Sequence, residues 1–246
     1  MRLTDGVHLV ASGRLGLSIT HPLDCHVYLV GSSEEAVLID SGCGLDVDAL
    51  LREIDASGIP REAISRILLT HAHADHAGGA AALAESLGAT VWASPVAAKA
   101  LRVGDEEATG LTRARSAGIY PQTLRLKPMP EIRELTPGPG RIGGFQLEVI
   151  ETPGHCAGHL TFLAKLAQLT CLFAGDVLFT RGRIVLLAAP DCSLLQLSES
   201  LRTLTGYPFD ALLPGHAEFA MKGGSDHLME AVGYLDQGHV PPFLLP

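Results

Sequence analysis

The chain has 246 residues, of which 47% are hydrophobic and 18% are charged, a composition typical of a globular protein with a substantial core. Disorder of the whole chain is therefore excluded. The formal net charge of −9 opposes contact with phosphate backbones and anionic lipid, so neither nucleic acid nor a membrane surface is an expected partner.

The N-terminal stretch has no continuous apolar segment behind a basic start, and no later stretch offers about 18 uninterrupted apolar residues. The five cysteines are odd in number and contain no C-x-x-C pair, which favours reduced thiols over a disulfide framework. We therefore expect a cytoplasmic protein. The pattern does not indicate an oligomeric state.

In chain order, the first predicted elements are a β-hairpin around the turn-rich sequence GSSEE, an amphipathic helix with apolar residues at helical spacing, and a strand buried on both faces. A small-residue helix and another short strand follow. The ranges are 25–30 and 36–40 (hairpin), 45–58 (helix), 66–70 (strand), 77–88 (helix) and 90–93 (strand).

Residues 95–134 mix glycine, proline and charged residues without a clear period, and we expect a variable, flexible cover over a site rather than regular structure. The pattern resumes with strands, then a helix that begins at Ser193 with an S-x-x-Q capping box, then a strand and a last helix. The ranges are 145–151, 160–164, 170–174 and 211–214 (strands) and 225–235 (last helix).

The same order of strands, loop and helix occurs twice in the chain. We therefore predict a single domain over residues 1–246 with two structural halves, about 1–94 and 135–246, and with residues 95–134 inserted near the active site.

A cluster of metal-binding side chains follows the strand 66–70, in the sequence HAHADH. His71 and His73 are two apart, so an extended backbone points both rings to one side, and Asp75 and His76 continue into a loop that can turn back. A strand end fixes the backbone while the loop faces solvent, which suits a metal site. Three more loops offer one such side chain each, beside glycine: His155, Asp176 and His216.

The sequence THAHADHAGG, followed by His155, Asp176 and His216 in that order, resembles the metallo-β-lactamase superfamily over essentially the whole chain. The resemblance implies an α/β (α+β) fold, a four-layer αβ/βα sandwich with two facing mixed β-sheets and a metal site at one edge. Asp40 matches the superfamily's first motif, in which an aspartate supports the metal-site loops without binding metal.

The resemblance also implies a ligand set. His71, His73 and His155 would bind one metal ion, Asp75, His76 and His216 a second, and Asp176 would bridge the two. Nitrogen and oxygen ligands suit two Zn ions, and Fe or Mn is also compatible. A metal-bound hydroxide would then attack an acyl carbonyl, with Asp75 and Asp176 as the catalytic carboxylates that orient it or relay its proton.

Within the superfamily, true β-lactamases lack the bridging aspartate, whereas glyoxalase II-type thioesterases and N-acyl homoserine lactonases carry it. The segment GDVLFTRG is similar to the glyoxalase II pattern, so a thioesterase acting on a small-molecule substrate is the first expectation and a lactonase the second. A persulfide dioxygenase with one iron on His71, His155 and Asp176 is a third possibility. A non-catalytic metal-binding protein is a fourth, and the acidic charge disfavours a nuclease.

The glyoxalase II family appends a helical domain that helps to hold glutathione, whereas 30 residues follow His216 here. Substrate recognition is therefore expected to fall to residues 95–134. Their candidate substrate contacts are Arg113, Arg115 and Tyr120, which suit an anionic or apolar acyl group.

Overall fold

The computed structural model describes residues 1–142 and 145–244. The chain divides into two compact units. The first is formed by Met1–Thr136 and Ile142, and the second by Pro137–Arg141 together with the described residues from Phe145 onward.

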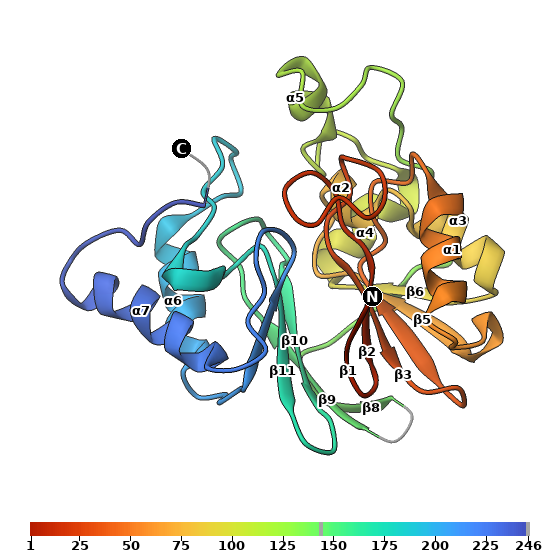
Figure 1. Ribbon diagram of the computed structural model, residues 1–246. Helices are drawn as coiled ribbons and strands as arrows, with labels where there is room; N and C mark the ends of the chain where they lie inside the picture. The colour runs from red at the N-terminus through yellow and green to blue at the C-terminus, as the bar shows by residue number, and fades with distance from the viewer. Residues whose placement is uncertain (143–144, 245–246) are drawn as a thin grey trace. The chain divides into compact units, whose positions relative to one another are not determined.

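The first unit contains a mixed seven-stranded sheet in the order β1-β2-β3-β4-β5-β6-β7 (Figure 1). Neighbours from β1 to β4 run antiparallel, and neighbours from β4 to β7 run parallel. The strands are β1 (Arg2–Thr4), β2 (Val7–Ala11), β3 (Val27–Gly31), β4 (Ala36–Ile39), β5 (Ile64–Leu68), β6 (Thr90–Ala93) and β7 (Arg133–Glu134).

One face of this sheet packs against helices. Leu29, Leu38, Ile67 and Val91 are partners in register across β3 to β6 and belong to one buried core with residues of α1, α3 and α4. The helical segments are α1 (Val47–Ala56), η1 (Arg61–Ala63), α2 (Ala74–Ala77), α3 (Ala80–Leu87), α4 (Pro95–Val103) and α5 (Leu111–Ser116).

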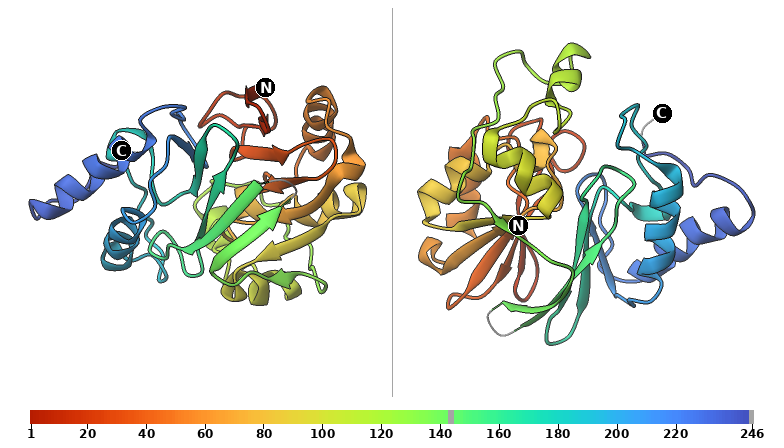
Figure 2. Two further views of the ribbon diagram at one scale, coloured as in Figure 1. Left: turned by 90° about the horizontal axis from the view of Figure 1, so that it is seen from below. Right: turned by 180° about the vertical axis from the view of Figure 1, so that it is seen from behind.

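The second unit contains a mixed five-stranded sheet in the order β12-β11-β10-β9-β8, with α6 and α7 packed on one face (Figure 2). Strand β10 lies between β9 and β11 and is antiparallel to both. The elements are β8 (Gly138–Ile142), β9 (Phe145–Glu151), β10 (Leu160–Lys165), β11 (Thr170–Gly175), η2 (Thr180–Gly182), α6 (Leu194–Leu204), β12 (Ala211–Pro214) and α7 (Gly224–Asp236).

Most predicted elements are confirmed, including the hairpin β3–β4, the helix α1 and the cap of α6, where the Ser193 hydroxyl accepts a hydrogen bond from the Gln196 N–H. The sequence pattern does not predict strands β1 and β2. In the described part of the chain, no helix is long and apolar enough to cross a membrane.

The expectation of irregular structure over residues 95–134 is confirmed only in part, because the segment forms α4, α5 and the short strand β7, with turns and loops between them. Ser94 caps α4 through a hydrogen bond from the Ala97 N–H, and Pro95 occupies the first turn, where its missing N–H has no cost. Leu101 and Leu111 are buried in the core of the first unit, and this burial stabilises helices that have a weak sequence pattern.

Candidate metal centre

The HAHADH cluster occupies the loop after β5 and the short helix α2. His73 is the residue at the N-terminal cap of α2, and the helix turns the chain so that His76 returns towards His71, with ring centroids 4.1 Å apart. His71 and His76 are fully buried. The first unit thus brings together His71, His73, Asp75 and His76.

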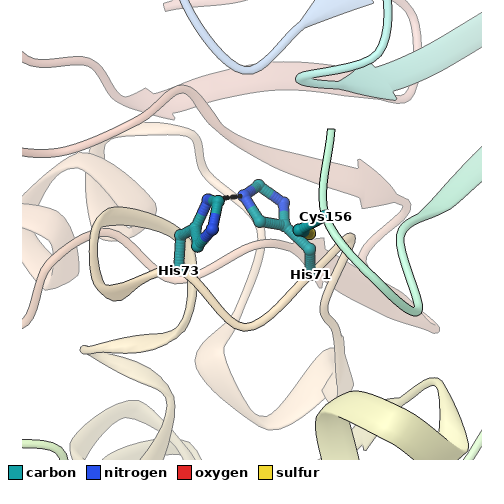
Figure 3. Close-up of side chains that lie close together, drawn as sticks. All are labelled: His71, His73 and Cys156. Carbon is teal, nitrogen blue, oxygen red and sulfur yellow. Dashed lines mark hydrogen bonds between the residues drawn. The ribbon is translucent and has the colours of Figure 1, made fainter. Parts of the chain in front are cut away.

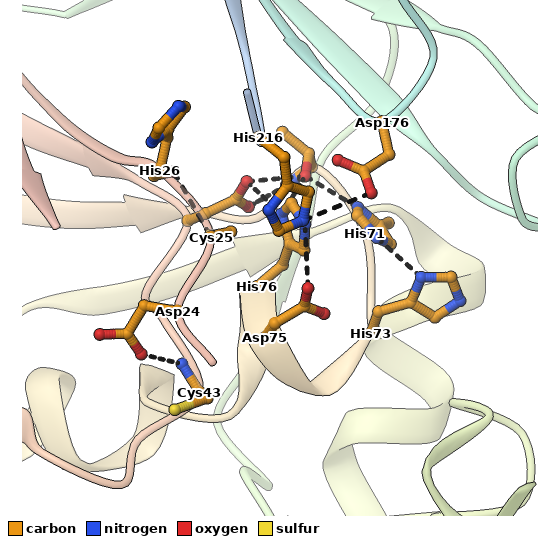
Figure 4. A network of polar contacts seen from close by, with 12 residues as sticks. Asp24, Cys25, His26, Cys43, His71, His73, Asp75, His76, Asp176 and His216 are labelled. Carbon is orange, nitrogen blue, oxygen red and sulfur yellow. Dashed lines mark hydrogen bonds and ion pairs between the residues drawn. The ribbon is translucent and has the colours of Figure 1, made fainter. Parts of the chain in front are cut away.

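Asp40 determines which ring nitrogen His76 presents. The carboxylate lies 2.8 Å from His76 Nδ1, and because a carboxylate can only accept, Nδ1 carries the proton and Nε2 keeps its lone pair. That Nε2 faces the Asp75 carboxylate at 3.9 Å (Figure 4). Asp40 therefore orients the ring of His76.

Thr70 has the same effect on His71. Its hydroxyl lies 2.8 Å from Asp40 Oδ2, so the hydroxyl proton points to Asp40 and the oxygen accepts from His71 Nδ1 at 3.0 Å. His71 Nε2 is left with its lone pair and lies 2.9 Å from His73 Nδ1 (Figure 3). Two ring nitrogens directed at one point can share a proton or a metal ion.

The second unit brings together its own three candidates, which follow the ends of β9, β11 and β12. Asp176 Oδ2 lies 3.7 Å from His155 Nε2 and 3.6 Å from His216 Nε2. His155 Nδ1 is directed at the Val185 carbonyl at 3.4 Å, which places its proton on Nδ1. All three side chains are buried.

The donor sets of both units fit metal ions. In His155 and His76 the lone-pair nitrogen faces a carboxylate oxygen at 3.7 and 3.9 Å, and two such atoms repel each other unless a cation lies between them. Neutral imidazole nitrogens and carboxylate oxygens are the ligands that Zn²⁺ accepts in catalytic sites. One carboxylate oxygen flanked by two imidazoles has the arrangement expected of a bridging ligand.

Two of the predicted substrate contacts, Arg113 and Arg115, lie on α5, and Tyr120 follows that helix. Arg115 forms an ion pair with Glu106 and donates to the Leu124 carbonyl at 2.7 Å. Arg113 is exposed on the same helix, and Tyr120 is partly buried against the core of the first unit. The guanidinium of Arg115 is thus occupied in holding residues 106–124 together.

Several residues that surround the candidate centre are not predicted from the sequence. Thr70 and Thr152 carry no signal in sequence, since a buried hydroxyl is recognised only by its partner. The spacing of His159 suggests a structural residue, yet its ring hydrogen bonds the main chain of Asp176. Asp24 was also missed, and it accepts from the Cys43 N–H at 2.8 Å.

Cys43 lies near His21 and Asp24, within a group of side chains whose ligand atoms are all within 4.8 Å of one another. Burial and the Asp24 carboxylate raise the pKa of the Cys43 thiol, so it is protonated at neutral pH. The thiol lies 3.4 Å from His21 Nδ1, and Asp24 also accepts from Thr20. We interpret this group as a hydrogen-bonded anchor of the loop before β3.

Backbone strain accompanies the candidate centre. Asp40, Arg181 and Ala217 have φ of 63°, 62° and 62°, the left-handed region that residues other than glycine rarely adopt. Asp40 contacts His76, and Ala217 directly follows His216. Such strain persists only where surrounding contacts hold the backbone in place.

A family model described as "Metallo-beta-lactamase superfamily" matches residues 21–216. The chain belongs to this superfamily. The fold agrees: the Rm3 metallo-beta-lactamase has a TM-score of 0.67 at 25% identity, covering 89% of this chain and 88% of that one. A metallo-beta-lactamase family protein from Thermus thermophilus has a TM-score of 0.72 at 24% identity, covering 96% and 81%. The predicted metallo-β-lactamase fold is confirmed.

Two curated relatives of this superfamily member are named as hydrolases of acyl groups. A hydroxyacylglutathione hydrolase of Dechloromonas aromatica is 30% identical over 190 residues, which is 77% of this chain and 56% of the relative. An atrochrysone carboxyl ACP thioesterase of Aspergillus fumigatus is 27% identical over 196 residues, which is 74% of this chain and 36% of the relative. The chain spans less than two thirds of the length of each.

Proposed function

We propose that this metallo-β-lactamase superfamily member is a metal-dependent hydrolase of an acyl carbonyl, with a small-molecule thioester as its substrate class. The observation that carries the proposal is the orientation of the donor atoms. In each unit, lone-pair nitrogens of neutral histidines are directed at carboxylate oxygens that cannot donate to them.

We further propose that the two ligand sets serve one dinuclear centre, with two Zn ions as its occupants. His71, His73, Asp75 and His76 would come from the first unit, and His155, Asp176 and His216 from the second. Support comes from the order of these residues along the chain, which follows the superfamily's motifs, and from the position of Asp176 between two histidines.

Metal ions bound there would lower the pKa of a coordinated water to about 7 and polarise the acyl carbonyl. Asp75 is the more exposed of the two catalytic carboxylates, at 18% against 8% for Asp176. Its oxygens are therefore better placed to accept the proton that the attacking water loses. Asp40 and Thr70 keep His76 and His71 in the tautomers that present Nε2.

The relatives favour a thioester over a lactone, because one is named a thioesterase and another a hydrolase of hydroxyacylglutathione. We propose a cytoplasmic location, which agrees with five cysteines that form no disulfide in the described structure. For the acyl group we propose contact with Arg113 and Tyr120, and for Arg115 a structural role instead.

The test combines metal analysis by mass spectrometry with assays of the same sample on S-lactoylglutathione and on a long-chain acyl homoserine lactone. We expect about two Zn per chain and hydrolysis of the thioester. Asp176→Ala is expected to lower metal content and activity together, because it removes the oxygen that lies between two histidines.

Asp236→Ala is the matched control in the same unit, since Asp236 is an exposed carboxylate paired with Arg202. It should leave both quantities unchanged. Hydrolysis of the lactone alone would move the substrate class to lactones. About one Fe per chain with neither substrate cleaved would reject the hydrolase, and unchanged metal content in Asp176→Ala would reject the bridging role.

A further inference from the structure

We infer that His159 is a positioning residue that fixes the main chain of Asp176, and so controls metal binding in the second unit. The inference rests on the proposed function, because it assigns Asp176 to the metal centre. His159 is fully buried, and its ring forms hydrogen bonds with Thr152 and with the main chain of Asp176.

The place of His159 in the sheet explains how it does this. It immediately precedes β10, the strand between β9 and β11. Thr152 immediately follows β9, and Asp176 immediately follows β11. His159 therefore stands level with both residues, one step beyond the regular sheet.

The two ring nitrogens link the two neighbours. The Asp176 N–H donates to His159 Nε2 at 3.1 Å, so Nε2 is the unprotonated nitrogen. Nδ1 must then carry the proton, and it donates to the Thr152 hydroxyl at 2.9 Å. The Thr152 N–H in turn donates to the His159 carbonyl at 2.9 Å, which continues the ladder between β9 and β10.

The imidazole thus accepts a main-chain N–H directly after the end of β11. A buried N–H that loses its acceptor costs free energy, so the loop after β11 would shift to find another partner. Asp176 would move with it. His155 is also involved, because its ring lies 6.1 Å from that of His159, edge to face.

The test uses two amide variants of similar size and polarity. In His159→Gln the side-chain oxygen can occupy the place of Nε2 and accept from Asp176, while the Thr152 bond is lost. In His159→Asn the side-chain amide can occupy the place of Nδ1 and donate to Thr152, while the Asp176 bond is lost. Zn²⁺ dissociation constants are measured by competition with a chromophoric chelator, and the unfolding temperature of each metal-free protein is measured alongside.

We expect His159→Asn to raise the Zn²⁺ dissociation constant ~10–100-fold and His159→Gln to stay close to the wild type. Visible absorption of the Co²⁺-loaded proteins should report the same order, because it depends on ligand geometry. Equal dissociation constants in the wild type and His159→Asn would overturn the inference. So would equal weakening in both variants, with equally lowered unfolding temperatures, since that marks a role in folding alone.

Thr152→Val gives a second route if the histidine variants do not fold. It removes the acceptor that keeps the proton on Nδ1, and the tautomer with a proton on Nε2 cannot accept from Asp176. Weaker Zn²⁺ binding is expected, and unchanged binding contradicts the inference.

Failure to cleave a thioester, with the Asn and Gln variants still different, would reject the proposed substrate and leave this inference standing. A wild type that binds no Zn²⁺ would reject both.

Discussion

Three histidines of the candidate centre are oriented by a hydrogen bond of the ring nitrogen Nδ1, which leaves Nε2 for the candidate site. His76 donates to Asp40, His71 to Thr70, and His155 is directed at the Val185 carbonyl. Each of these contacts fixes a tautomer and a ring orientation. A motif supplies the histidine, but its partner decides which nitrogen is available as a ligand.

A residue with no such partner is Thr161 in β10, whose buried hydroxyl finds no hydrogen-bond acceptor or donor among the described residues. It lies opposite Ile150, a residue of the core beneath α6 and α7. Thr161→Val keeps the shape and removes the unsatisfied group, so we expect the free energy of unfolding to rise by ~1 kcal/mol in chemical denaturation.

Thr152→Val is the matched comparison on the neighbouring segment. The Thr152 hydroxyl accepts from His159, so the same chemical change is expected to lower the free energy of unfolding by ~1–3 kcal/mol. Equal free energies of unfolding for Thr161→Val and Thr152→Val would show that the hydroxyl of Thr161 is hydrogen-bonded in solution.

At the scale of elements, an ion pair of α5 joins distant parts of the segment 95–134. Arg115 of α5 pairs with Glu106, and Glu106 Oε1 also accepts from the Leu126 N–H at 3.3 Å. Burial alone would raise the pKa of Glu106, but the bonds from Arg115 and Leu126 outweigh it and lower that pKa. The pair therefore joins the two ends of the loop around α5.

We expect Arg115→Gln to lower the free energy of unfolding by ~1–3 kcal/mol at pH 7, because Glu106 loses its charged partner. Lys127→Gln, in the same segment, should change it by less than ~0.5 kcal/mol, because the ion pair of Lys127 with Glu85 is exposed. Hydrogen exchange over residues 105–126 should rise in the first variant alone. Equal exchange in both would contradict the role of the pair.

The difference in free energy of unfolding between the wild type and Arg115→Gln should depend on pH in a defined direction. The folded-state pKa of Glu106 lies below its usual value of 4.5, so the contribution of the pair is complete above that value and is lost as the pH falls through the folded pKa. Denaturation of wild type and Arg115→Gln should therefore converge in acid. A difference that persists at low pH would mean that Arg115 acts through the Leu124 carbonyl instead.

At the scale of the whole molecule, bound metal should contribute to stability. Ligands from both units are expected to bind the ions, and an ion that binds only the folded chain stabilises it by about 2.7 kcal/mol at a concentration of 100 times its dissociation constant. Chelation with EDTA should therefore lower the unfolding temperature, and added Zn²⁺ should restore it.

Asp176→Ala is the control for that experiment, and its unfolding temperature should respond less to EDTA than that of the wild type. Identical unfolding temperatures of the wild type with EDTA and with Zn²⁺ would contradict metal binding by the folded protein.

The sequence predicts those features that depend on local periodicity or on a dense motif. The GSSEE turn indicates the β3–β4 hairpin, helical spacing indicates α1, and HAHADH indicates a cluster of polar side chains after β5. It does not predict α4 and α5, whose stability comes from burial of Leu101 and Leu111. The contacts of Thr70 with Asp40 and of His159 with Asp176 join residues that are far apart in the sequence, so no local pattern reveals them.

The left-handed backbone of Ala217 lowers the stability of the fold but restricts the chain beside His216. An alanine there costs about 1 kcal/mol more than a glycine would, and it stands directly after His216. Selection for heat resistance alone would favour the glycine, which removes the strain but also lets the chain beside His216 sample more conformations. Variants selected only for stability at high temperature would thus carry glycine at position 217, with a more stable fold but a less firmly held His216. A screen that also requires metal retention would keep the alanine.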